Sequence, residues 1–123
     1  MIYFDNEEYR VKFYKDPASA EIPVLDYIEG LKEKERAKVL KYIEFLRINK
    51  GILDEPYSKH IRGKIRELRV DFSSSRHRIF YFTFVGKNII LLHAFLKRTP
   101  KTPEREIKKA EENCFKVLRS SNL

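Results

Sequence analysis

Residues 88–107, NIILLHAFLKRTPKTPEREI, decide the fold that we predict for this chain. The stretch opens with an apolar run, IILLHAFL, which is typical of a strand that is buried on both faces. It then becomes basic, and its two prolines end the strand because proline has no N–H to donate to a ladder. Thr102 as N-cap and Pro103 at the first helical position predict that a helix follows. A buried strand therefore carries a group of cations to a rigid corner at the edge of the sheet.

The remaining sequence predicts a small α+β fold in a single domain, residues 1–123. We expect a helical hairpin and a C-terminal helix, packed on one face of a sheet of about four strands, in the order β-α-α-β-β-β-α. Residues 52–63, which include a proline and a glycine, are predicted to form a loop. The predicted strands cover residues 9–14, 64–72, 76–85 and 88–96, and the predicted helices cover residues 19–31, 32–50 and the segment from Pro103.

Antiparallel pairing of the last three strands brings the start of the middle strand close to the ends of its two neighbours. We therefore expect Arg69, Arg78, Lys97 and Arg98 at one end of the sheet. Glu67 and Arg69 share one strand face, so a simpler interpretation is that they pair with charges across the sheet.

The net charge of +8 is distributed unevenly. Residues 1–58 contain ten lysines and arginines against twelve acidic residues, whereas residues 59–123 contain sixteen against six. A basic surface on one side predicts a polyanionic partner, with nucleic acid or the ribosome as the leading candidate. The alternative is a generally basic, solvated surface.

Several classes of protein find no support in the sequence. No stretch has the ~18 apolar residues of a membrane span, and the N-terminus lacks a signal-peptide pattern. Phosphate-binding glycine motifs and the serine-hydrolase elbow are absent. The histidines have no metal-ligand spacing, so we expect no metal and no cofactor, and His93 is predicted to be a core residue. The single Cys114 fits a reducing cytoplasm and a packed position on a helix.

Three pieces of sequence resemble the RelE/ParE toxin superfamily, and in particular the phage-derived HigB-like branch of type II toxin–antitoxin systems. The pieces are GKIRELRV at residues 63–70, RIFY at residues 78–81 and LHAFLKRTPKTP at residues 92–103. They occur in the family's order and spacing and cover about half of the chain directly. The resemblance implies a cytoplasmic toxin that cleaves mRNA on the ribosome without a metal ion. It also implies neutralisation by a HigA-like antitoxin with a helix-turn-helix domain.

By this resemblance the candidate catalytic residues are Glu67, Arg69, Arg78, Lys97 and Arg98. The candidate RNA-binding residues are His60, Arg62, Lys64, Arg66, Arg76 and Lys101. Without a histidine pair, arginine and lysine would have to stabilise the charge that develops on the phosphate.

Two departures from RelE itself concern the acid and the base. The paired lysines of RelE correspond here to Ile65 and Glu67, and the C-terminal tyrosine of RelE has no counterpart. The general base therefore stays open between Glu67, His60 and Lys97. Two other functions also stay open: a binder that inhibits translation without cutting RNA, and a gyrase poison like those on the ParE side of the superfamily.

Overall fold

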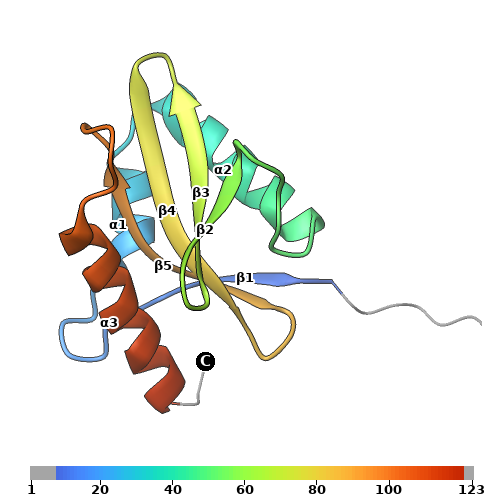
Figure 1. Cartoon of the computed structure of the whole chain (residues 1–123), viewed down its shortest axis with the longest axis vertical. Coiled ribbons are helices and arrows are strands. Elements are labelled where there is room, and N and C mark those ends of the chain that lie inside the picture. Colours follow the sequence, from blue (N-terminus) through green and yellow to red (C-terminus); the bar gives the residue numbers. More distant parts are fainter. Residues whose placement is uncertain (1–7, 121–123) are drawn as a thin grey trace, which may run out of the picture.

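A computed structural model describes residues 8–120 of the chain, and its elements are labelled in Figure 1. The predicted α+β class is confirmed, because strands and helices occur in one mixed arrangement. The strands are β1 (Arg10–Phe13), β2 (Ser58–Arg62), β3 (Ile65–Phe72), β4 (Ser75–Phe84) and β5 (Asn88–Leu96). The helices are α1 (Pro23–Glu29), α2 (Glu33–Ile48) and α3 (Glu104–Ser120).

The strands form one sheet in the order β1-β5-β4-β3-β2. β1 pairs with β5 in parallel, and the other neighbours pair antiparallel. β5 lies between β1 and β4, which explains why its sequence is a continuous apolar run.

The sheet has five strands rather than about four, because residues 58–62 form β2. The predicted loop over 52–63 is therefore wrong for those residues. β2 lies at the edge of the sheet, where Lys59, His60 and Arg62 are exposed, so its sequence lacks a strand's apolar alternation. Hydrogen bonding to β3 stabilises β2 as a strand, although the sequence of β2 does not predict one.

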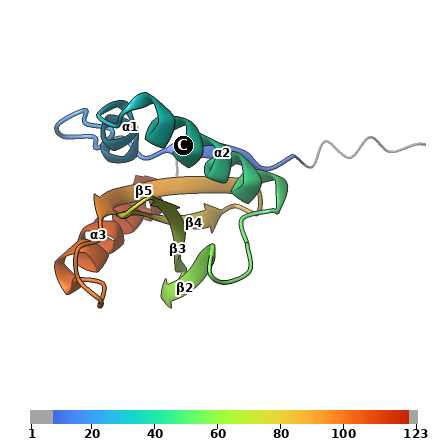
Figure 2. The same cartoon turned by 90° about the horizontal axis from the view of Figure 1, so that it is seen from above.

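Helices cover both faces of the sheet, which corrects the expectation that they would share one face (Figure 2). α1 and α2 pack against Leu68, Ile79, Leu91 and their neighbours in one buried cluster. α3 packs against Phe80, Phe82 and their neighbours in a second cluster on the opposite face. The sheet therefore lies between two apolar cores, and strand residues alternate between them. None of the helices within residues 8–120 is long and apolar enough to cross a membrane.

The helix ends differ slightly from the predicted ones. α1 begins at Pro23 rather than residue 19, since Asp16 accepts backbone hydrogen bonds from Ala18 and Ser19 in a turn. The carbonyl of Pro103, and not that of Thr102, accepts the first backbone bonds of α3, from Glu106 and Ile107. The segment that leads into α3 thus runs one residue further than predicted.

The end of α2 is fixed by a close contact with the sheet. Gly51 has a φ of +85° and donates its N–H to the carbonyl of Leu46. Its carbonyl accepts a hydrogen bond from the buried Tyr81 hydroxyl at 2.8 Å. A Cβ at this position would lie 2.8 Å from Thr83 Oγ1, so glycine is required both by conformation and by space.

Candidate active site at one end of the sheet

Strand pairing brings the predicted cations of three strands together. Arg69 of β3 pairs directly with Arg78 of β4, which in turn pairs with Phe95 of β5. Just after β5, Lys97 donates its backbone N–H to the carbonyl of Arg76 at 2.8 Å. Directly paired residues share a sheet face, so Arg69 and Arg78 lie on the face that α3 covers.

Glu67 lies beneath these cations. Its side chain is fully buried, and Oε1 accepts a hydrogen bond from Arg69 Nε at 2.9 Å. Within residues 8–120, Oε2 has no hydrogen-bond partner. The contact therefore runs along one strand, rather than across the sheet as the simpler interpretation expects. Because it engages only Nε, the terminal nitrogens of Arg69 stay able to bind an anion in a bidentate way.

Arg78 lies deeper than Arg69. Only 5% of the residue is exposed, and its guanidinium donates to Asp71 Oδ1 at 2.8 Å and to the carbonyl of His77 at 3.0 Å. Its Nε is buried, with no hydrogen-bond partner among the described residues. Arg78 therefore contributes positive potential from behind the surface and is already fixed by Asp71.

Lys97 has a lowered pKa. Partial burial is the largest cause, the charge of Glu67 opposes it, and repulsion from Arg78, Arg69 and Arg76 lowers the pKa further. These effects show that Lys97 shares one electrostatic environment with the strand residues. We call Glu67, Arg69, Arg78 and Lys97 the sheet-end cluster. A lysine with a lowered pKa releases its proton more readily than an ordinary lysine.

A hollow of about 480 Å³ opens over Arg69 and Lys97, and we call it the candidate groove. It lies between the β2–β3 edge and the segment that leads into α3. Its lining is Lys59, His60, Ile61, Arg69, Lys97, Pro100, Lys101, Thr102 and Ile107. Four cations, one histidine and two isoleucines are therefore among the residues that line the groove.

His60 is exposed, and its Nε2 lies 2.7 Å from the carbonyl oxygen of Gly63. A carbonyl can only accept, so this contact places the ring proton on Nε2 in the neutral tautomer. Nδ1 is then left as an acceptor. His60 lines the candidate groove, so a residue of the groove has an imidazole nitrogen with an available lone pair.

The structure does not bring Arg98 to the candidate groove. Arg98 lines two other hollows, one with Ser74, Ser75 and Arg76 and one with Arg105 and Glu106. Its charge also partly opposes the burial that raises the pKa of Tyr27 in α1, on the face that α1 and α2 cover. Lys97 and Arg98 both line the first of these hollows, but only Lys97 also lines the candidate groove.

The predicted RNA-binding residues are likewise divided. Lys101 lines the candidate groove, and Arg76 lines the neighbouring hollow that shares Lys97 with it. Arg62 forms ion pairs with Glu104 and Glu111 at 2.7 and 3.3 Å, which tie β2 to α3.

Two further cations lie away from the groove. Arg66 donates to Ser58 Oγ from the face that α2 covers. Lys64 is exposed in the β2–β3 turn. Burial raises the pKa of Cys114, and the charge of Lys64 partly offsets that rise.

Sequence reasoning missed a buried hydrogen-bonded chain on the α1–α2 face. His77 is 2% exposed, its Nδ1 lies 2.7 Å from the Tyr27 hydroxyl, and its Nε2 lies 2.6 Å from Glu35 Oε2. Burial and then the charge of Glu35 raise the pKa of Tyr27 to about 12, against the opposing charge of Arg98. The partners come from α1, α2 and β4, so no local sequence signal joins them. His93 fits its predicted core role, because its half-buried ring bonds to Glu106 at 2.9 Å.

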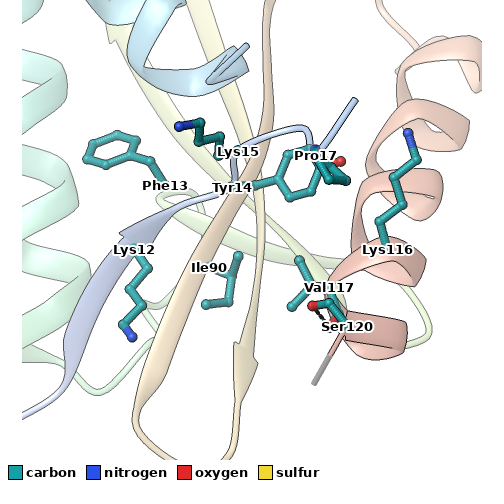
Figure 3. Close-up of a pocket in the computed structure, with 9 residues that line it drawn as sticks. All are labelled: Lys12, Phe13, Tyr14, Lys15, Pro17, Ile90, Lys116, Val117 and Ser120. Atoms are coloured by element: carbon teal, nitrogen blue, oxygen red, sulfur yellow. Dashed lines mark hydrogen bonds between the residues drawn. The ribbon is translucent and has the colours of Figure 1, made fainter. Parts of the chain in front are cut away.

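A second hollow, of about 280 Å³, lies where β1 meets the last turns of α3 (Figure 3). Its lining includes Phe13, Tyr14 and Ile90, and its rim residue Lys116 pairs with Asp16 at 3.2 Å. α3 reaches both hollows: Ile107 lines the candidate groove and Lys116 lines this one, so about 14 Å of helix separates them. This hollow is mostly apolar and does not extend the cationic site. Among residues 8–120, no three histidine, cysteine or carboxylate side chains form a group that could hold a metal ion.

Comparison with known proteins places the chain in a family. No curated protein is significantly similar to the chain. The model of the family described as "Phage derived protein Gp49-like (DUF891)" matches residues 26–114, which is more than half of the chain. The match includes the whole sheet-end cluster and every residue that lines the candidate groove. The chain therefore belongs to the phage-derived Gp49-like family, a toxin-like family within the RelE/HigB group.

Proposed function

We propose that this protein is the toxin of a type II toxin–antitoxin system, from the HigB-like branch, and cleaves mRNA on the ribosome. The observation that carries the proposal is the candidate groove, in which Arg69 and Lys97 meet above a buried carboxylate. Membership of a toxin-like family supports the toxin part of the proposal and implies an antitoxin partner.

The proposed reaction is attack of a ribose 2′-oxygen on the adjacent phosphorus, without a metal ion. The 2′-hydroxyl loses its proton to a base, the P–O5′ bond breaks, and the departing 5′-oxygen gains a proton from an acid. The products are a 2′,3′-cyclic phosphate and a 5′-hydroxyl. Cations are needed because negative charge builds on the phosphoryl oxygens in the transition state.

Arg69 suits the phosphate contact. Its Nε is held by Glu67, so the guanidinium is oriented before RNA binds, and its terminal nitrogens match two phosphoryl oxygens. Glu67 itself is fully buried. In this proposal it therefore positions Arg69 and does not touch the substrate.

His60 and Lys97 suit the two proton transfers. Nδ1 of His60 is an acceptor when Nε2 donates to Gly63, which makes His60 the proposed base. The lowered pKa of Lys97 makes it the proposed acid for the 5′-oxygen. Both side chains line the candidate groove.

The proposed dependence on the ribosome is supported by the cationic character of the groove, which binds a backbone but orients it poorly. Its four cations can hold the RNA backbone, but they do not by themselves align the 2′-oxygen with the P–O5′ bond. A ribosome that presents the message in a fixed conformation would provide the missing proximity and orientation, which can lower a barrier by several kcal/mol.

Mapping of 5′ ends of cellular mRNA after a short pulse of expression tests the proposal. We expect cuts inside translated messages that keep register with the reading frame, and none when initiation is blocked. Arg69→Lys is the informative variant, since it keeps a cation beside Glu67 but loses the bidentate fork. Lys108→Ala, an exposed cation of α3, is the matched control.

Three outcomes separate the candidate functions. In-frame cuts that Arg69→Lys abolishes support the endonuclease. Growth arrest with intact mRNA favours the non-cleaving inhibitor, and arrest with DNA damage favours the gyrase poison. Each of the last two overturns the proposal.

A further inference from the structure

Exposed apolar side chains gather along one side of α2 and the loop that follows it. A hollow of about 290 Å³ there is lined by Tyr42, Phe45, Asn49, Leu53 and Tyr57. The Tyr42 ring lies 6.1 Å from that of Phe45 and 5.9 Å from that of Tyr57, measured between centroids. We call this hollow, together with the exposed Ile48 and Ile52 on either side of the α2 C-terminus, the aromatic patch.

The exposure of the aromatic patch is large for such residues. Phe45 is 43% exposed, Tyr57 49%, Ile48 59% and Ile52 62%. A single exposed apolar residue is ordinary, but several exposed apolar residues around a hollow are typical of an interaction site. α2 buries Val39, Ile43 and Leu46 against the sheet. Tyr42 and Leu53 are half-buried and pack against the same core, so the patch is the exposed margin of that core.

The charges around the aromatic patch indicate what would cover it. The ammonium of Lys38 lies 5.5 Å from the centroid of the Tyr42 ring, and that of Lys41 lies 5.7 Å from the centroid of the Phe45 ring. The carboxylate of Glu44, which lies nearby on the helix, is occupied by Arg47 at 2.7 Å. Lys38 also donates one hydrogen bond to the carbonyl of Asp71, which leaves two of its three N–H donors. Carboxylates of a partner would therefore find cations beside the rings.

Two other occupants fit less well. A second copy would bring lysines against lysines in a symmetric interface, on a chain whose net charge is already +8. RNA would need a basic surface, yet residues 33–57 contain six lysines and arginines against five acidic residues. Exposed isoleucines also favour a protein surface over nucleic acid.

We infer that the aromatic patch is the docking surface for an amphipathic helix with acidic flanks, which belongs to the antitoxin partner. This inference rests on the proposed function, since it deepens the partner that the function requires. Side chains of such a helix at positions i, i+3 or i+4, and i+7 would fill the hollow beside Tyr42 and Phe45, and its carboxylates would meet Lys38 and Lys41.

The test uses the protein encoded beside this gene as the probe, co-expressed and also purified for titration. Phe45→Glu and Lys41→Glu alter the patch at exposed positions, and Lys108→Glu on α3 is the matched charge-reversal control. We expect the dissociation constant to rise about 30-fold for Phe45→Glu and about tenfold for Lys41→Glu. Both variants should stay toxic when expressed alone, and Lys108→Glu should bind as the wild type does. Thermal unfolding by circular dichroism confirms that each variant folds.

The outcomes separate the docking surface from the proposed function. If the neighbouring protein neutralises the wild type and both patch variants equally, the docking inference is wrong while the toxin function stands. If it neutralises none of the toxins, or the wild type is not toxic, the proposed function fails first. A wild-type dimer that Phe45→Glu converts to a monomer would assign the patch to a second copy and overturn the inference.

Discussion

Arg69→Ala should destabilise the protein as well as inactivate it, because Glu67 depends on Arg69. The Glu67 side chain is fully buried, and its only hydrogen bond from the described residues comes from Arg69 Nε at 2.9 Å. Truncating Arg69 leaves a buried carboxylate with neither oxygen hydrogen-bonded. A simple alanine scan would therefore confuse loss of folding with loss of catalysis.

The size of the effect follows from burial. Removing one partner of a fully buried ion pair costs about 3–5 kcal/mol. Arg69 retains 24% exposure, and the charge of Lys97 lies close enough to compensate partly, so we expect about 2 kcal/mol. For a domain of this size, that loss lowers the Tm by about 8 °C.

A double-mutant cycle separates the two roles of Arg69. Glu67→Gln removes the buried charge, so the double variant with Arg69→Ala should regain about 1 kcal/mol over Arg69→Ala alone. Activity should not return with stability, because the double variant still lacks the guanidinium. Urea unfolding measures the first quantity, and mRNA cleavage in a translation reaction measures the second. Arg119→Ala, on the exposed side of α3, serves as the control.

Two results would refute this reasoning. An Arg69→Ala protein as stable as the wild type would mean that Glu67 does not depend on Arg69. A double variant that recovers cleavage together with stability would mean that Arg69 acts only on folding and does not contact the RNA phosphate.

Three other predictions follow from single features. The pKa of Tyr27 is raised to about 12, so between about pH 10 and 12 the folded protein keeps this proton while the unfolded chain loses it. The free energy of unfolding should therefore be unaffected below pH 10 and fall by about 2 kcal/mol over that interval. Urea titrations at several pH values measure this fall, which Tyr27→Phe should lack. Gly51→Ala places a Cβ 2.8 Å from Thr83 Oγ1 at a φ of +85°, so it should lower the free energy of unfolding by about 2–3 kcal/mol. Gly86→Ala is the control: φ is +77° but no atom lies within 4 Å of the added Cβ, so the loss in denaturant unfolding should be about 1 kcal/mol. Four cations line the candidate groove, so a plot of the logarithm of the affinity for single-stranded RNA against the logarithm of salt concentration should have a slope of about −3. Fluorescence anisotropy measures this slope, and a value near zero would contradict RNA binding there.

Much of the fold was accessible from sequence because it depends on local patterns. The apolar run of residues 89–96 indicated a strand buried on both faces, and β5 spans Asn88–Leu96 between two neighbours. β2 was missed because an edge strand is stabilised by its partner and has little apolar signal of its own.

The meeting of Arg69, Arg78 and Lys97 was also predictable, because antiparallel order decides which strand ends become neighbours. The sequence could not show that Arg98 lies outside the candidate groove, or that Arg62 is bound by Glu104. Those outcomes depend on how the chain turns after β5 and where α3 packs.

The sequence by itself determined the periodicity of the strands, the positions where prolines end them, and the excess of cations in the second half of the chain. Only the tertiary structure decided which of those cations share a groove, that Glu67 is buried beneath Arg69, and that His77 joins Tyr27 to Glu35. The physical reason is the distance along the chain over which each interaction acts. Hydrophobic periodicity and proline act within a few residues, whereas burial and pairing of a side chain depend on strand register and on helices distant in sequence.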